Sequence, residues 1–169
     1  MSPRAVSALL LTAALLAAAS AHARQSDRDQ PMDIHSGHQV GGLNDGEPII
    51  MSRGVVITQG TLEIKSDRAE VTLRGGEVDR VVLTGSPATM FQETDEGEPL
   101  NAHASRIVYD MRNDTLTMTG NALVEQPRGD MRGERIVYNL QTERVEAGGE
   151  GAGRVHMRIQ PRTQRQDSN

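Results

Sequence analysis

The chain has 169 residues and a formal net charge of −5, with no cysteine, no tryptophan, two tyrosines and one phenylalanine. This mildly acidic balance argues against a nucleic-acid-binding protein, which would present a basic face. The lack of cysteine excludes disulfides, thiol catalysis and cysteine-ligated metal sites.

Residues 1–23 have the pattern of a secretory signal peptide. Arg4 supplies a positive charge, residues 5–19 form an apolar run, and Ala21-His22-Ala23 places small residues where signal peptidase cleaves. A membrane anchor is the alternative, but the run is short against the roughly 20 residues that span a bilayer. We therefore predict cleavage before Arg24 and export.

The remaining chain divides into three parts by composition. Residues 24–30 are polar without periodicity, and residues 161–169 are polar after an initial proline, so both segments are predicted to be disordered. Residues 31–160 alternate between apolar and polar positions along most of their length, which predicts a single β domain.

The predicted elements of this domain are strands. A short alternating strand begins at Met32, and residues 37–48 have the composition of a loop. Further strands are predicted over residues 49–51, 54–59, 62–66, 69–73, 78–84, 88–93 and 155–160. No window beyond the signal peptide predicts an amphipathic helix.

Residues 104–149 contain the same sequence pattern twice, and each copy is typical of a β-hairpin. Ile107 and Ile136 are 29 positions apart, as are Tyr109 and Tyr138, without a gap. In each copy the alternation pauses at a polar turn and then resumes, as in two antiparallel strands with one buried face. Residues 67–85 form a looser third copy. Hairpins stacked along one axis make an elongated β structure.

Four segments occur in the order and spacing of a known family: residues 55–60 (VVITQG), 85–91 (GSPATMF), 103–105 (HAS) and 120–126 (GNALVEQ). In this succession the chain resembles the LptA family of periplasmic lipopolysaccharide transport proteins, also called OstA-like. The strand pattern and the resemblance both imply an all-β fold, an elongated, twisted β-jelly roll of antiparallel strands. Its two sheets are expected to face each other across an apolar interior.

The resemblance also implies a function. Members of this family are periplasmic bridge proteins that carry lipopolysaccharide from the inner-membrane export complex to the outer-membrane assembly complex. The implied partners are the lipid A part of lipopolysaccharide, the jelly-roll modules of LptC and LptD, and further copies of the chain joined end to end. Unpaired edges of the terminal strands would make these joints. Neither an enzymatic step nor a cofactor is implied.

The predicted lipid-binding residues are apolar positions that face the interior, either by alternation or by their match to the family. They are Met32, Ile34, Met90, Met111, Leu116, Met118, Ile136 and Tyr138. Methionine is flexible and polarisable, so a methionine-rich wall adapts to irregular acyl chains. The alternative is that methionine only fills gaps that aromatic residues fill elsewhere.

Two other functions stay open. The chain resembles LptC and LptD modules as well, although the first normally keeps an N-terminal helix and the second continues into a membrane barrel. A carbohydrate-binding jelly roll is the other alternative, but it would stack sugars on exposed aromatic residues, which are scarce here.

The charged residues give weaker indications of function. His35 and His38 are three positions apart, but a zinc site needs further ligands, so no metal is predicted. Lys65 is the only lysine among 18 basic residues. Base composition explains such an excess of arginine. Arginines at strand positions could also meet lipid A phosphates, namely Arg53, Arg68, Arg74, Arg80, Arg106 and Arg135.

Overall fold

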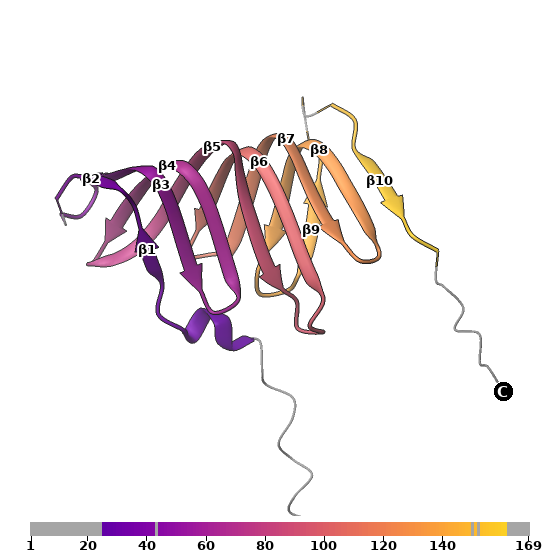
Figure 1. The fold of residues 1–169 in the computed structure, drawn as a ribbon, viewed down its shortest axis with the longest axis horizontal. Helices are drawn as coiled ribbons and strands as arrows, with labels where there is room; N and C mark the ends of the chain where they lie inside the picture. Colours follow the sequence, from indigo (N-terminus) through magenta and orange to yellow (C-terminus); the bar gives the residue numbers. More distant parts are fainter. Residues whose placement is uncertain (1–24, 43, 150, 152, 162–169) are drawn as a thin grey trace, which may run out of the picture.

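The computed structural model of the protein describes residues 25–42, 44–149, 151 and 153–161. The predicted signal peptide and most of the predicted C-terminal tail therefore lie outside the described residues. In the described part, ten strands form one antiparallel sheet (Figure 1). The elements are the 3-10 helix η1 (Gln25–Asp29) and the strands β1 (Asp33–His35), β2 (His38–Val40), β3 (Ile49–Gln59), β4 (Leu62–Arg74), β5 (Glu77–Glu93), β6 (Pro99–Asp110), β7 (Thr115–Gln126), β8 (Gly129–Asn139), β9 (Arg144–Ala147) and β10 (His156–Ile159).

The strands follow one another along the sheet nearly in sequence order. The order is β1-β3-β4-β5-β6-β7-β8-β10, with β2 also paired to β3 and β9 also paired to β8. Each strand from β3 to β8 pairs with its neighbours in the chain, as in a series of connected hairpins. The all-β antiparallel architecture predicted from the sequence is thereby confirmed.

The two copies of the sequence repeat form the hairpins β6–β7 and β8–β9. Tyr109 and Tyr138 occupy equivalent, fully buried positions in them. The turns repeat as well: a side-chain oxygen of Asp110 accepts two backbone N–H hydrogen bonds in the first turn, and Asn139 does the same in the second. Such side-chain caps favour a turn locally. Local chemistry therefore sets the same register in both hairpins.

Three long strands replace three pairs of predicted short strands. β3, β4 and β5 each continue through the residues that were expected to separate two short strands. At these residues the register with the neighbouring strand shifts, as in a β-bulge, but the strand does not end. In β3 the added residues are Arg53 and Gly54, with positive φ angles of 67° and 78°. β6 and β7 have similar irregularities within residues 103–106 and 119–122. Since neighbouring strands carry them at paired positions, they form one line across the sheet.

Along this line the sheet folds over on itself. The backbone N–H of Asp95, in the β5–β6 turn, donates to Glu143 Oε1, in the β8–β9 turn, at 2.6 Å. These turns lie at opposite ends of the strands, so they can meet only if the two halves of the sheet face each other. The two expected sheets are therefore two halves of one continuous sheet. The expected face-to-face arrangement is therefore formed within a single sheet.

Four names describe this folded sheet. The crest is the line of irregular pairings, and the seam is the line where turns from opposite strand ends meet; Figure 1 shows the strands bending over at the top and the turns at the bottom. The front half carries the β3–β4, β5–β6 and β7–β8 turns, and the back half carries the β4–β5, β6–β7 and β8–β9 turns.

Two N-terminal segments differ from their predictions. Residues 24–30 were expected to be disordered, but η1 lies within them, and the side chain of its Asp27 is buried. Residues 37–48 were expected to be a loop, but β2 lies within them and pairs with β3. A strand or 3-10 helix of three to five residues is too short to show a hydrophobic period, and tertiary contacts hold both. In the described residues no helix reaches the length and apolarity needed to cross a membrane.

Candidate functional site

The interior between the two halves is lined by rows of paired apolar residues. Because cross-strand partners share a face of the sheet, each row runs across the strands and along the long axis of the molecule. The back half has two such rows, Met51-Ala69-Leu83-Ile107-Met118-Ile136-Ala147 and Ile49-Val71-Val81-Tyr109-Leu116-Tyr138-Val145. Every position in both rows is hydrophobic. Apolar residues therefore alternate with polar ones along each strand and form unbroken apolar rows across the strands.

The front half adds a third row that crosses eight strands. It consists of Ile34-Ile57-Ile64-Met90-Ala102-Val124-Met131-Met157. With neighbouring strands about 4.8 Å apart, this row is roughly 30 Å long. Three of its members are methionines: Met90 lies in the middle of the row, and Met131 and Met157 lie at its C-terminal end. The three rows together make one apolar track through the molecule.

All eight residues predicted to bind lipid lie on or beside this track. Five of them are buried in the core, namely Met90, Leu116, Met118, Ile136 and Tyr138. The other three are half-buried and pack against the core, namely Met32, Ile34 and Met111. The structure thus brings all eight predicted positions into one hydrophobic cluster.

Sequence reasoning left out other members of the same rows. Tyr109 and Ile107 were expected to face inward, and both are fully buried, yet they were not counted among the lipid-binding residues. The repeat could have added them, since they are the counterparts of Tyr138 and Ile136. Met131 and Met157 were missed for another reason. Their place in the front row depends on the pairing of β8 with β10, which no local pattern shows.

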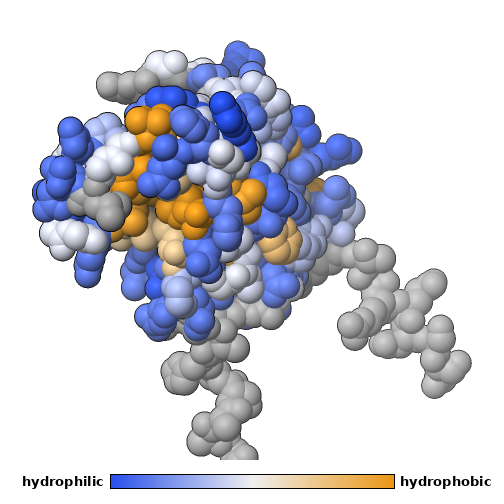
Figure 2. Space-filling view, turned by 60° about the vertical axis from the view of Figure 1, so that its left-hand side comes forward, coloured by the Kyte–Doolittle hydropathy of each residue, from blue (hydrophilic) through white to orange (hydrophobic). Residues whose placement is uncertain are grey.

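The track reaches the surface at both ends of the sheet. Figure 2, turned to bring the N-terminal side forward, shows apolar surface gathered in the middle of that face between hydrophilic surfaces. At the C-terminal end β9 and β10 pair with different parts of β8 and diverge. A hollow of about 210 Å³ lies there, lined by apolar atoms of Val124, Met131, Val145, Met157 and Ile159 among others. The apolar interior therefore opens to the surface at both ends of the sheet.

The seam beside the N-terminal strands is closed by η1. The Asp27 carboxylate accepts hydrogen bonds from the backbone N–H of Thr61 at 3.0 Å and from its hydroxyl. Thr61 belongs to a front-half turn. Arg28 reaches the back half, where it donates to the carbonyl oxygen of Leu140 at 3.1 Å and lies 3.4 Å from Asp114. The short helix therefore ties the two halves together across the seam.

Beneath η1 lies a small buried polar group. The Gln59 side chain donates to the carbonyl oxygens of Arg28 and Gln30, both at 3.2 Å, and the Tyr109 hydroxyl donates to Gln59 Oε1 at 3.5 Å. The buried Tyr138 hydroxyl has no hydrogen-bond partner among the described residues. These hydroxyls mark where the apolar interior meets the polar seam.

Both tyrosines stay neutral under ordinary conditions. Burial raises the pKa of Tyr109 to about 12, with the Asp114 carboxylate adding to the rise and Arg28 opposing it. Burial, reinforced by nearby carboxylates, raises the pKa of Tyr138 well above its usual range. The track thus presents hydrocarbon, thioether and neutral phenol groups, which suit alkyl chains. Among the described residues no group of three or more His, Asp or Glu could hold a metal ion.

Comparisons with known proteins agree with this geometry. The family described as LptA/(LptD N-terminal domain) LPS transport protein matches residues 34–144. The chain is 35% identical to the Escherichia coli K12 "Lipopolysaccharide export system protein LptA" over 164 residues, covering 95% of this chain and 88% of that one. It is 30% identical to the corresponding protein LptH of Pseudomonas aeruginosa over 168 residues, covering 92% and 93%.

A solved structure shows the same fold. The crystal structure of LptH, described as the LptA-homologous periplasmic component of the conserved lipopolysaccharide transport device of Pseudomonas aeruginosa, superposes with a TM-score of 0.73 at 26% identity. It covers 80% of this chain and 99% of that one. The β-jelly-roll assignment is therefore confirmed. On sequence and fold together, the chain belongs to the LptA/LptD N-terminal domain family of lipopolysaccharide transport proteins.

Proposed function

We propose that this protein carries lipopolysaccharide across the periplasm with the acyl chains buried between the halves of its folded sheet. The observation that carries the proposal is the continuous apolar track, which runs across the strands and opens at both ends of the sheet. Each methylene exposed to water costs about 0.8 kcal/mol, so a lipid with several chains needs a continuous apolar path. The names of the relatives support this cargo.

Loading requires the two halves to separate. Leu116, Met118 and Ile136 have no exposed surface, so acyl chains can reach them only when the back half moves away from the front half. The bends at the crest can act as the hinge, and the seam contacts of η1 are polar bonds that can be exchanged for water. Lipid chains would then replace packing between side chains, so the side chains stay out of water while the acyl chains become buried as well.

Photo-crosslinking tests the assignment of the interior. Crosslinking amino acids at the eight predicted positions should capture lipopolysaccharide in cells, whereas Asp110 and Arg158, which face outward, should not. Met90 and Thr89 form a matched pair, since they are neighbours on opposite faces of β5. Equal capture at both positions would rule out the inner face as the lipid site.

We also propose that copies join end to end through the terminal strands. Among the described residues, β1 and β10 each pair along one edge only, and the front apolar row begins at Ile34 in β1 and ends at Met157 in β10. Pairing β10 of one copy with β1 of the next would continue this row across the joint. Such a heterologous contact does not close on itself, so it builds a filament. The jelly-roll modules of LptC and LptD would use the same edges.

An engineered disulfide tests this joint without interference, because the chain has no cysteine. The double variant Ile34→Cys, Met157→Cys should form a ladder of disulfide-linked multimers under oxidation, and each single variant should stay monomeric, because its cysteine meets no second cysteine at the joint. A double variant that folds but stays monomeric at high concentration would contradict the end-to-end model.

We further propose that the protein reaches the periplasm by signal-peptide cleavage before Arg24. The apolar run and the small residues at positions 21 and 23 support this site. N-terminal sequencing of the protein from the periplasmic fraction should begin at Arg24, and a chain that retains Met1 would contradict the assignment.

The carbohydrate-binding alternative loses its main support. Tyr109 and Tyr138 are fully buried, so neither can stack on a sugar at the surface. No catalytic step forms part of the proposed function.

A further inference from the structure

A pair of basic residues three positions apart recurs on every second strand where the sheet bends. The pairs are His35 and His38, Lys65 and Arg68, His103 and Arg106, and Arg132 and Arg135. They lie in β1 and β2, in β4, in β6 and in β8. The last three pairs flank the irregular pairings, so one member lies on each side of the crest.

The register lines these residues up in two rows on the outer face. The front row is His35-Val56-Lys65-Thr89-His103-Leu123-Arg132-His156. The back row is His38-Ser52-Arg68-Thr84-Arg106-Thr119-Arg135. We call them the crest rows. Since strands lie about 4.8 Å apart, basic side chains on every second strand recur about every 10 Å.

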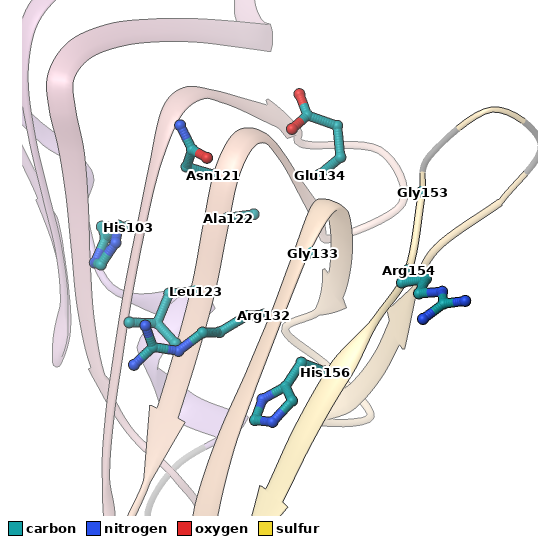
Figure 3. Close-up of a pocket in the computed structure, with 10 residues that line it drawn as sticks. All are labelled: His103, Asn121, Ala122, Leu123, Arg132, Gly133, Glu134, Gly153, Arg154 and His156. Atoms are coloured by element: carbon teal, nitrogen blue, oxygen red, sulfur yellow. The ribbon is translucent and has the colours of Figure 1, made fainter.

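Between the crest rows the surface is hollowed. A hollow of about 470 Å³ is lined in part by His103, Arg132 and His156, and another of about 420 Å³ by Ser86, Ser105 and other residues. The two hollows share His103 and Asn121, so they adjoin. Figure 3 shows Arg132 between His103 and His156, while Glu134 and Arg154 extend away from them. The crest therefore offers a groove instead of a smooth ridge.

Part of the positive charge is uncompensated. Lys65, Arg68 and Arg132 form exposed ion pairs with Glu63, Glu70 and Asp130 respectively. In the residues that the structure describes, no ion pair joins the side chains of His103, Arg106 or Arg135. Exposed ion pairs contribute little and exchange readily with other anions. Among the described residues, an anionic ligand would therefore find unpaired guanidinium groups at Arg106 and Arg135, and exchangeable cations at Lys65, Arg68 and Arg132.

An acidic row limits the shape of such a ligand. On each strand, the next residue that faces outward lies two positions from the front crest row, toward the turns of the front half. These residues pair as Asp33-Thr58-Glu63-Phe91-Asn101-Glu125-Asp130-Arg158. This row lies within a Debye length of about 8 Å of the front crest row. A broad anionic surface such as a bilayer would meet both rows at once. A narrow, linear polyanion can lie along the crest and avoid the acidic row, so that the acidic residues of the crest itself, Asp67 and Glu134, are the ones it meets.

We infer that the crest is a binding site for a linear anionic saccharide. In the back crest row the hydroxyl residues Ser52, Thr84 and Thr119 alternate with the arginines, which provides partners for sugar hydroxyls between anchors for phosphate or carboxylate groups. Recognition is by charge and hydrogen bonding, without aromatic stacking. The site lies opposite the seam, and it does not depend on the proposed transport of lipid through the interior.

Two charge-matched double variants test this site. Arg106→Gln with Arg135→Gln removes two charges from the crest, and Arg80→Gln with Arg144→Gln removes two from exposed positions near the back turns. The probe is a fluorescent heparin oligosaccharide, a linear sulfated saccharide, with neutral dextran of similar size as the blank. We expect the crest variant to weaken binding about tenfold, since charge-assisted hydrogen bonds are lost, and the other variant less than about twofold.

The outcomes separate clearly. Selective loss in the crest variant, with both variants melting like the wild type, supports the site. Equal loss in both variants, or no binding by the wild type, overturns it. Stronger crest-dependent binding to polyglutamate, to DNA or to phosphatidylglycerol vesicles than to the oligosaccharide overturns the assignment to a saccharide. Capture of lipopolysaccharide at Met90 of the wild type tests the transport proposal separately, so failure here leaves that proposal intact.

Discussion

The apolar track ends differently at the two edges of the sheet. At the N-terminal edge the half-buried Ile34 packs against the core, and η1 ties the front and back halves together nearby. At the C-terminal edge the same row ends in Met157, whose side chain is 56% exposed. One edge is partly covered by its own chain, and the other is left uncovered. An exposed apolar end of this kind promotes association, which agrees with the proposed end-to-end joint.

The largest effect on stability is expected in the middle of the apolar track, which serves as the reference for its two ends. Met118→Asp should lower the free energy of unfolding by about 4 kcal/mol, because it places an unpaired charge at a position with no exposed surface. Thr117→Asp, its neighbour on the outer face, should cost less than about 1 kcal/mol. Urea denaturation measures both. The opposite order would show that the assigned register is wrong.

The N-terminal closure predicts the next largest effect. Asp27→Ala leaves the backbone N–H and the hydroxyl of Thr61 without their acceptor, which should cost about 2 kcal/mol. Asp29→Ala is the control, because Asp29 is exposed on the same short helix. Hydrogen exchange should also show faster opening of the β3–β4 turn in the Asp27 variant alone. Equal stability of the two variants would mean that η1 does not hold the seam.

The tyrosine beneath this closure predicts a pH effect. Folded Tyr109 keeps its proton to about pH 12, whereas an unfolded tyrosine releases it near pH 10. The stabilisation is complete below about pH 10 and is lost between the two values at about 1.4 kcal/mol per pH unit. Tyr109→Phe should remove this contribution, so the stability difference between wild type and variant should shrink as the pH rises from 9 to 11. A constant difference would place the hydroxyl in water.

The smallest effect on the monomer is expected at the open end. Met157→Asp should change the free energy of unfolding by less than about 0.5 kcal/mol, since the side chain is already exposed. Ile34→Asp, in the same row at the other end, should cost about 1 kcal/mol or more. Sedimentation at high concentration should nevertheless show that Met157→Asp reduces end-to-end assembly. If both variants are equally destabilised, the apolar side chains at the two ends are equally buried.

The sequence by itself determined the hairpins and the face that each residue presents. Alternation with a period of two is a local property, and the turn residues Asp110 and Asn139 carry their own hydrogen bonds. For that reason Tyr109 and Tyr138 could be placed inside from the sequence alone, as could the predicted lipid-binding residues of the repeat.

Tertiary structure decided how these strands combine. An extra residue such as Arg53 interrupts the alternation in the same way as a turn, so the sequence suggested two short strands where one bent strand exists. Whether an interruption ends a strand depends on pairing with neighbours distant in the chain. The same long-range register joins Ile34 to Met157 in one apolar row and His35 to His156 in one basic row. A net charge of −5 hides that basic row, because composition sums charges that the fold separates.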